Sequence, residues 1–425
     1  MGRLLTRGHP AAAAAVQAMI AGRAPHAVLL AGAAGSGKTT LALDLAAGLL
    51  CDAPDPSDRP CRACRGCRLV AHGTHADVHR LAPSGPGLQV RIGERSNPEP
   101  GTVRRLIADI ALLPVEGGNR VAIVERADRL NEDAQSALLK ILEEPPPGVT
   151  IVLCADRDDL LLPTVLSRCV RVRLGPVPIR EIEAILEDAA VADAPRANRL
   201  ARLAWGRPGA ALALARAPEA VTARDEIART LIDLAGERAA RRLSVGRELL
   251  ARAGELVSSL DRASAAADAG PGAETGSGTG SPKRSRPRGA APARAGDVRP
   301  ARAGGDTGDP AAAGDDSGDA GEGDPADAPA VRAPATERRR AAAALIDIWR
   351  DVARDLLLVE LGEDRRLRDP ALLDDLRAAG AIPPADLRAF IGRLARSAEL
   401  LEANVSPELA VDALLLAWPR TARAA

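Results

Sequence analysis

Short apolar segments separated by amphipathic ones predict a parallel α/β domain in the first part of the chain. Residues 26–50, HAVLLAGAAGSGKTTLALDLAAGLL, read as an apolar strand, a glycine-rich turn and a helix. Further strands are predicted at 121–124 and 150–154, with a weaker one at 170–174. Between them, LNEDAQSALLKILEE predicts a helix that Asn131 caps and that the prolines after it end. Strands that alternate with helices are typical of a parallel sheet with crossover connections.

After this region the pattern becomes helical, with one interruption. Ala, Leu and Arg recur at spacings of three and four from 179 to 260, and helices are predicted again from 340 to 418. Between Leu260 and Leu345 there is no Leu, Ile, Met or aromatic residue, so this stretch cannot offset the entropy of ordering. We predict a disordered insert here. It is basic, then acidic, and a solvated linker is favoured over a nucleic-acid contact.

Composition narrows the function classes. The 425 residues include 57 basic and 57 acidic ones, so there is no global basic field to hold nucleic acid. Aromatic residues are 1% of the chain, which excludes base-stacking platforms and predicts a core of Leu, Val, Ile and Ala. No apolar run approaches the roughly 18 residues of a membrane span. The Ala-rich start predicts a first helix rather than a signal peptide, and we expect a cytoplasmic protein.

The most specific chemical motif is GAAGSGKT at 32–39, a complete G-x-x-x-x-G-K-[ST] pattern between a predicted strand and helix. Gly35 and Gly37 let backbone N–H groups turn toward phosphate oxygens. Lys38 reaches the β and γ phosphates, and Thr39 is placed to ligate Mg²⁺. A glycine-rich turn without a nucleotide is the less favoured interpretation. The motif therefore predicts ATP binding.

The cysteines predict a metal site. Four of the six, Cys51, Cys61, Cys64 and Cys67, lie in one short segment, which in a cytosolic chain favours a metal over disulfides. Four thiolates can close a tetrahedral Zn²⁺ site with no open position, so the predicted role is structural. Three histidines at 72, 75 and 79 lie nearby, but the cysteines already complete the set.

Two further stretches bear on catalysis. RVAIVERADRL, residues 120–130, is a strand that ends in Glu125 and Arg126, where an ATPase holds Mg²⁺ with one acid and activates water with a second. An arginine has no lone pair to accept that proton. Arg168, in TVLSRCVRV, alone would be an ordinary solvated residue. Beside a P-loop it becomes a candidate finger for the γ-phosphate of a neighbouring subunit.

Six motifs in this order resemble the delta-prime subunits of bacterial DNA polymerase III clamp loaders, which are AAA+ proteins. They are HAVLLAG with GKTT, CRACRGC, HADVHRL, ALLKILEEPP, LPTVLSRC and GRPGAALAL. The resemblance is dense from 26 to 215 and reaches the C-terminal helices through IWRDVARDLLL and EANVSPELAVDALLL. The active gamma/tau subunits share several of these motifs, so the degenerate acid pair is what favours the delta-prime type.

The resemblance implies an α/β AAA+ P-loop domain with a parallel sheet, followed by an all-α lid and an all-α collar for pentamer assembly. The expected bounds are 1–177 for the AAA+ domain with its zinc knuckle at 51–67, 178–217 for the lid, 218–263 for the first part of the collar, 264–337 for the insert and 338–425 for the rest of the collar. It also implies that Ser167, Arg168 and Cys169 present an arginine finger in trans, and that Arg207 is the second sensor in the lid. The expected nucleotide-binding residues are Gly32, Ala33, Ala34, Gly35, Ser36, Gly37, Lys38, Thr39, Thr40, Glu125 and Arg207.

The favoured hypothesis is a delta-prime-type stator subunit that binds ATP, with Mg²⁺, but hydrolyses it poorly or not at all. Arg126 replaces the second acid, and Ala155 and Asp156 stand where the resemblance leads us to expect a Thr or Asn pair in the first sensor. Such a chain is a component of a DNA-directed DNA polymerase (nucleotidyltransferase) holoenzyme and not itself a polymerase. Its implied partners are the gamma/tau and delta subunits in a heteropentamer and, through that complex, the sliding clamp and primed DNA.

Two alternatives stay open. One is the active gamma/tau-type ATPase of the same machine, which Arg126 disfavours. The other is a free-standing P-loop kinase or NTPase, in which the cysteine cluster, the Ser-Arg-Cys motif and the long helical region would have no use.

Overall fold

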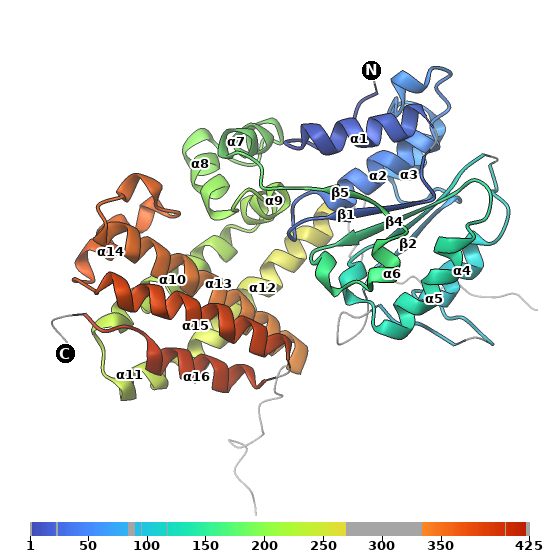
Figure 1. Cartoon of the computed structure of the whole chain (residues 1–425). Coiled ribbons are helices and arrows are strands. Elements are labelled where there is room, and N and C mark those ends of the chain that lie inside the picture. Colours follow the sequence, from blue (N-terminus) through green and yellow to red (C-terminus); the bar gives the residue numbers. More distant parts are fainter. Residues whose placement is uncertain are drawn as a thin grey trace, which may run out of the picture. The chain divides into compact units, whose positions relative to one another are not determined.

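The sheet predicted from the apolar segments is present in the computed structural model. In the described part of the chain it has five parallel strands in the order β2-β3-β4-β1-β5 (Figure 1). The strands are β1 (Ala27–Ala31), β2 (Val78–Leu81), β3 (Arg120–Val124), β4 (Val149–Ala155) and β5 (Val170–Arg173). Four of them lie where the sequence predicts strands. The pattern did not single out β2, because its four residues include a His and an Arg and form no apolar run.

The structure describes residues 2–22, 24–83, 90–94, 96–116, 118–268, 334–403 and 405–421. The predicted disordered insert, 264–337, lies for the most part outside them. At its two ends helices continue further than predicted, to Asp268 and from Ala335. Both ends are rich in alanine, the residue with the highest helix propensity, and an ion pair between Arg340 and Asp261 joins the two helices. No helix of the described residues is long and apolar enough to span a bilayer.

Helices cover both faces of the sheet (Figure 1). One face is covered by α1 (Pro10–Ala21), α2 (Lys38–Leu49) and α3 (Arg65–Ala71), and the other by α4 (Val103–Ile110), α5 (Glu132–Glu143) and α6 (Pro163–Leu166). Alternate residues of β1 point to opposite faces, with Val28 and Leu30 in one core and Ala27 and Leu29 in the other. Both cores are aliphatic, as composition predicted. A strand buried on both faces reads as a continuous apolar run, which explains why β1 was visible in the sequence.

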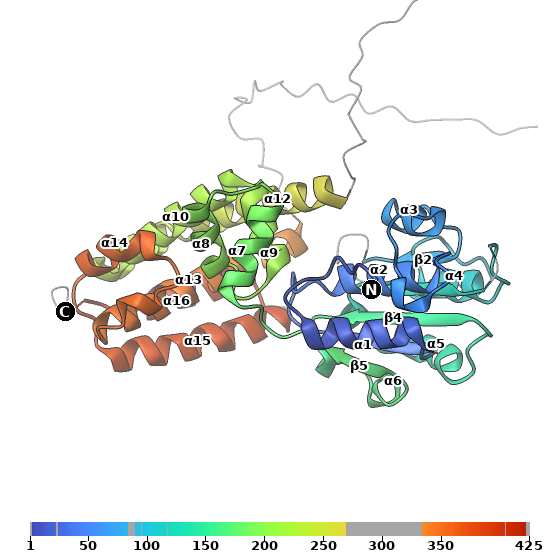
Figure 2. The same cartoon turned by 90° about the horizontal axis from the view of Figure 1, so that it is seen from above.

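Three helices after β5 form a small bundle with its own aliphatic core (Figure 2). They are α7 (Ile179–Asp188), α8 (Ala194–Leu203) and α9 (Pro208–Arg216). The expected boundary at 217 falls between α9 and the next helix.

The remaining helices pack around a separate core of their own. They are α10 (Pro218–Asp233), α11 (Ala239–Ser244), α12 (Gly246–Asp268), α13 (Ala335–Glu360), α14 (Leu373–Ala378), α15 (Pro384–Glu402) and α16 (Pro407–Ala417). Their core contains Trp349, Phe390 and Trp418, whose ring centroids lie 4.7 to 5.6 Å apart. The prediction of a purely aliphatic core is therefore wrong here, because composition gives the number of aromatic residues and not where they gather.

Candidate nucleotide site and metal centre

The P-loop connects the carboxyl end of β1 to the start of α2. Gly35 and Gly37 have φ angles of +76° and +100°, which L side chains rarely adopt, so the turn requires glycine at both positions. Gly37 precedes the first residue of α2, which places the loop at the positive end of that helix. Thr39 and Thr40 follow in the first helical turn. The loop thus has the backbone path that a phosphate cradle needs.

Lys38 is turned back onto its own loop. Its Nζ donates hydrogen bonds to the carbonyls of Gly32 at 2.8 Å and Ala33 at 2.9 Å. Nζ also forms an ion pair with Asp156 Oδ1 at 2.7 Å, and the lysine side chain is only 6% exposed. Three oxygens of the chain therefore surround an ammonium that has three N–H bonds.

Arg126 joins the same cluster of charges. Its Nε lies 2.9 Å from Asp156 Oδ2, and its terminal nitrogen lies 3.5 Å from Asp128 Oδ2. The Asp156 amide also donates to Asp128 Oδ1 at 3.0 Å. Arg126 holds a left-handed conformation, φ 58° and ψ 52°, which is uncommon for a residue other than glycine. The predicted substitution of an acid by Arg126 thus creates an ion pair that the sequence alone did not reveal.

Glu125, the acid predicted to face Mg²⁺, has a partner on the neighbouring strand. Its Oε1 accepts hydrogen bonds from Arg80 Nε at 2.9 Å and from an Arg80 terminal nitrogen at 2.7 Å. Because β2 pairs with β3, Arg80 and Glu125 are brought to the same end of the sheet. Any Mg²⁺ held by Glu125 would have to compete with this guanidinium.

The small helical bundle reaches the P-loop through the start of α9. The Gly209 amide donates to the Gly35 carbonyl at 2.8 Å. Arg207 is the residue before α9, and its Nε donates to the Ala204 carbonyl at 2.9 Å. Arg207 thus stands two residues before the Gly209 contact with the P-loop, and its role as a second sensor stays a prediction.

The residues present fit a nucleotide. The hydroxyl of Ser36 is buried and has no hydrogen-bond partner in the described structure. The P-loop backbone, Lys38 and Thr39 are the groups that would hold the phosphates and a bound Mg²⁺, which neutralises phosphate charge. His9 was missed by the sequence analysis. Its Nε2 lies 2.8 Å from the Ser36 carbonyl and braces the loop, and nothing in its surroundings in the sequence pointed to this.

Arg168 lies at the amino ends of the strands, whereas this site lies at their carboxyl ends. It precedes β5, whose first residue, Val170, pairs with Val28 near the start of β1, whereas the P-loop follows the end of β1. Its guanidinium is about one third exposed and forms an ion pair with Glu143 at 2.6 Å. It also donates to the Thr164 carbonyl at 2.8 Å. The strand direction therefore separates Arg168 from its own P-loop.

The four clustered cysteines form a candidate metal centre. Their Sγ atoms all lie within 4.8 Å of one another, and among the described residues no other group of three or more His, Cys, Asp or Glu side chains could hold a metal ion. The Sγ atoms of Cys51 and Cys64 are 3.9 Å apart, close to the roughly 3.8 Å edge of a tetrahedron with 2.3 Å Zn–S bonds. All six cysteines are free of disulfides. The cluster can hold a metal ion.

Backbone amides prepare the cluster for negative charge. The amides of Cys61, Cys64 and Cys67 donate to sulfur atoms of the cluster at 3.3 to 3.4 Å. Hydrogen bonds from the Ala63 and Cys64 amides lower the pKa of the Cys61 thiol to about 6. Burial instead raises the pKa of Cys67. One thiol is thus ready to ionise, and the buried one needs a cation to do so.

Asp44 ties this knuckle to the P-loop helix, a role that the sequence analysis did not foresee. The carboxylate belongs to α2 and is 1% exposed. It accepts hydrogen bonds from the Leu5 and Thr6 amides and forms an ion pair with Arg62, which lies between two of the cysteines. A single acid inside a leucine-rich helix was the available signal.

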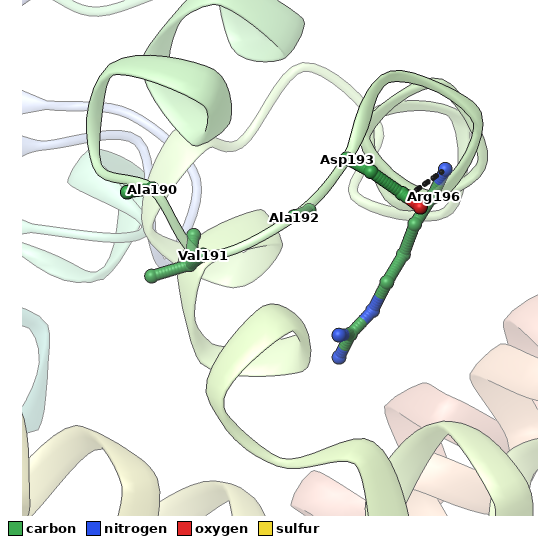
Figure 3. Close-up of a pocket in the computed structure, with 5 residues that line it drawn as sticks. All are labelled: Ala190, Val191, Ala192, Asp193 and Arg196. Atoms are coloured by element: carbon green, nitrogen blue, oxygen red, sulfur yellow. Dashed lines mark hydrogen bonds between the residues drawn. The ribbon is translucent and has the colours of Figure 1, made fainter.

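The structure also has a depression between α7 and α8 (Figure 3). Its polar groups already serve local structure: Asp193 caps α8 by accepting from the Arg196 amide, and the Arg196 guanidinium donates to the Ala215 carbonyl. None of its lining residues is a predicted site residue, and its polar groups are already paired within the bundle.

Comparisons with known proteins agree with these motifs. Residues 9–178 match the family model described as DNA polymerase III, delta subunit. DNA polymerase III subunit delta′ of Pseudomonas aeruginosa is 38% identical over 166 residues, 39% of this chain and 48% of the relative. The delta′ subunit of Escherichia coli is 35% identical over 46% of this chain and 55% of its own. The tau subunit of the same organism is 32% identical over 45% of this chain and 29% of its own.

The chain spans about half the length of the two delta′ relatives that it matches. Among solved structures, a DNA polymerase III gamma subunit-related protein from Thermotoga maritima covers 95% of this chain and 97% of its own. Its TM-score is 0.39 at 16% identity, a likeness too distant to bear on function.

Proposed function

We propose that this chain, whose residues 9–178 belong to the delta-prime family of DNA polymerase III clamp-loader subunits, works as the stator subunit of such a loader. In this role it assembles with gamma/tau and delta subunits into a heteropentamer that loads the sliding clamp onto primed DNA. It contributes structure and an arginine finger, and its own ATP hydrolysis is weak or absent. The long run of helices from α10 to α16 would supply the collar for assembly.

The observation that carries the loss of hydrolysis is the pairing of Arg126 with Asp156. The guanidinium occupies the position after β3 where a carboxylate would accept a proton from water, and it has no acceptor lone pair. The nearest acid, Asp156, is already shared between Arg126 and Lys38. No free base of the required kind is left at this end of β3 and β4 among the described side chains.

The position of Arg168 supports a finger that acts in trans. It lies at the amino end of β5, away from its own P-loop, and is partly exposed. Ser167 and Cys169 on either side complete the motif that the resemblance identifies. A guanidinium fixed beside a neighbour's γ-phosphate stabilises the charge of the transition state.

ATP with Mg²⁺ is the proposed ligand of the P-loop, held by residues 32–40 with Glu125 and Arg207 at the rim. Zn²⁺ is the proposed ion of the cysteine cluster, in a structural role, because four thiolates leave no coordination position open.

The active gamma/tau-type ATPase remains the alternative, and the 32% identity to a tau subunit favours keeping it. It requires hydrolysis by the isolated chain, which the Arg126–Asp156 pair opposes. A free-standing P-loop kinase is less favoured, because it gives the cysteine cluster and the helices after α9 no task.

The test is ATP turnover by the isolated chain and by a loader reconstituted with gamma/tau and delta subunits of the same organism. We expect the isolated chain to be nearly inactive, and Arg168→Ala to slow the loader by up to about a thousand-fold. Arg173→Ala is the matched control, because this arginine of β5 is exposed and lies at the other end of the strand. Brisk turnover by the isolated chain together with an unaffected Arg168→Ala loader would favour the gamma/tau alternative.

A further inference from the structure

We infer that Asp156 sets the nucleotide affinity of this P-loop by acting as an internal anion on Lys38. The inference rests on the proposed nucleotide site and names the residue that regulates it. It starts from the strand order β3-β4-β1, which aligns three loops along the carboxyl edge of the sheet. Arg126 follows β3, Asp156 follows β4 and Lys38 follows the loop after β1. Asp156 therefore stands between the two cations.

The lysine has no direction left for a phosphate while Asp156 is in place. Its Nζ has Asp156 Oδ1 at 2.7 Å and the carbonyls of Gly32 and Ala33 at 2.8 and 2.9 Å. The side chains of Lys38 and Asp156 are 6% and 14% exposed, so water screens their attraction little. A phosphate oxygen that reaches Lys38 must displace the carboxylate or bind beside it.

Asp156 is also held so that it does not readily turn away. Its backbone amide donates to Asp128 Oδ1 at 3.0 Å, and Asp128 is itself buried. Its second carboxylate oxygen faces Arg126 Nε at 2.9 Å. Arg126 adopts its left-handed conformation while making this contact, and such strain persists only where the surroundings enforce it. The carboxylate is therefore preorganised toward the lysine.

Removal of this charge should strengthen nucleotide binding for two reasons. First, Lys38 would no longer have to give up its ion pair with Asp156 in order to bind a phosphate. Second, the negative charge of Asp156 would no longer repel the phosphate. Interactions of this kind with a charged group contribute about 1.5–3 kcal/mol, which corresponds to roughly ten- to hundred-fold in affinity. Asp156→Asn keeps the shape of the side chain, removes its negative charge and replaces one acceptor oxygen with an NH₂ donor.

The experiment measures equilibrium binding of Mg·ATP and of ADP to the isolated full-length chain by calorimetry. Asp159→Asn is the matched control, because this exposed acid pairs with Arg157 and not with the P-loop lysine. Asp156→Asn should bind about ten-fold tighter or better than the wild type, and Asp159→Asn should bind like the wild type. Lys38→Ala added to Asp156→Asn should abolish the gain, which would place the ligand at the P-loop.

Three outcomes would each overturn the inference. The wild type and Asp156→Asn could bind nucleotide with equal affinity, neither protein could bind it, or the gain in affinity could survive Lys38→Ala. A melting curve in the absence of ligand checks that Asp156→Asn is folded. If it is not, Asp156→Ser replaces it and the same outcomes apply. The proposed function is judged separately by the Arg168 effect on the reconstituted loader, so a loader that depends on Arg168 alongside an unchanged Asp156→Asn affinity would reject only the inference.

Discussion

Arg168 and Glu143 form an ion pair at 2.6 Å that joins the last residue of α5 to the loop before β5. The glutamate comes from the ILEEPP stretch and the arginine from the SRC stretch, so two of the motifs behind the family resemblance meet in one contact. Both side chains are partly exposed, at 32% for the arginine and 49% for the glutamate. If Arg168 acts in trans as we propose, this exposed ion pair costs little to break.

We expect Glu143→Gln to change the stability of the chain only slightly and to leave the ATP turnover of the reconstituted loader undiminished. Pairs as exposed as this one contribute about 0–1 kcal/mol, and Arg168 keeps its hydrogen bond to the Thr164 carbonyl. Urea denaturation of the isolated chain and ATP turnover of the reconstituted loader measure the two effects. If Glu143→Gln slowed the loader as much as Arg168→Ala, the glutamate would itself be needed at the subunit interface.

The second prediction concerns the metal. Protein purified without added metal should contain about one Zn²⁺ per chain, because the four clustered cysteines can supply a closed tetrahedral set of thiolates. Cys64→Ser should reduce that content and lower the melting temperature, since the binding free energy of a structural zinc ion contributes to folding. Elemental analysis and thermal denaturation provide the measurements.

Cys154→Ala is the control for the metal prediction. Burial raises the pKa of the Cys154 thiol to about 12, so this residue cannot readily offer a thiolate. The zinc content of the Cys154→Ala variant should therefore match that of the wild type. A metal-free wild-type protein with four freely titrating thiols would refute the zinc assignment.

The third prediction concerns a buried ion pair under the loop after α4. Asp77 is fully buried and accepts hydrogen bonds from the Val115 and Glu116 amides and from Arg120, at 2.7 to 3.2 Å. Burial opposes its ionisation, but the two amides and the Arg120 guanidinium outweigh that effect and hold the pKa of Asp77 below its usual value. Asp77→Asn should therefore destabilise the protein at pH 7 by about 3–5 kcal/mol, since it leaves Arg120 without its counter-charge.

The pH dependence follows from the direction of the pKa shift. A carboxylate whose pKa is lower in the folded state stabilises the fold at pH values above its unfolded pKa of about 3.9, and this contribution is lost as the pH falls through the folded pKa. The gap in unfolding free energy between wild type and Asp77→Asn should thus narrow below about pH 4. Denaturant titrations at pH 7, 5 and 3.5 test this, with exposed Asp374→Asn as control. A gap that stays constant with pH would mean that Asp77 is not the titrating group.

Local pattern was sufficient for much of the fold. The apolar strands, the helix capped by Asn131 and the P-loop turn are set by residues close together in the sequence, and the structure places them as predicted. β2 was not predicted, because a strand of four mixed residues is stabilised by its pairing with β3 and not by its own pattern.

The sequence identified the individual charged residues of the site, but it did not identify which of them form ion pairs with one another. The sequence shows Arg126 and Asp156 as departures from the expected acid pair and first sensor. Only the strand order shows that they face each other and that Lys38 is the third member. Such pairings depend on which strands are neighbours, and a single sequence does not specify that order.

The last prediction concerns a carboxylate introduced at position 126, after β3. From the sequence alone, Arg126→Glu would be expected to recover ATP hydrolysis. In the structure, however, the side chain at 126 lies among the carboxylates of Asp128 and Asp156, at 3.5 and 2.9 Å from the arginine nitrogens. A glutamate placed there would meet like charges, which disfavour its ionised form and destabilise the loop.

We therefore expect Arg126→Glu alone to leave ATP turnover of the isolated chain at background and to lower its stability. Combination with Asp156→Asn removes one of the two repelling carboxylates and frees Lys38 for phosphate, so the double variant should show Mg²⁺-dependent phosphate release. Lys38→Ala added to the double variant is the control that should return turnover to background. Equal ATP turnover by Arg126→Glu with and without Asp156→Asn would show that Asp156 does not restrain the site. A folded double variant that binds ATP tightly but does not hydrolyse it would place the defect elsewhere. The hydrogen bonds between Glu125 and Arg80 would then be the next contact to break.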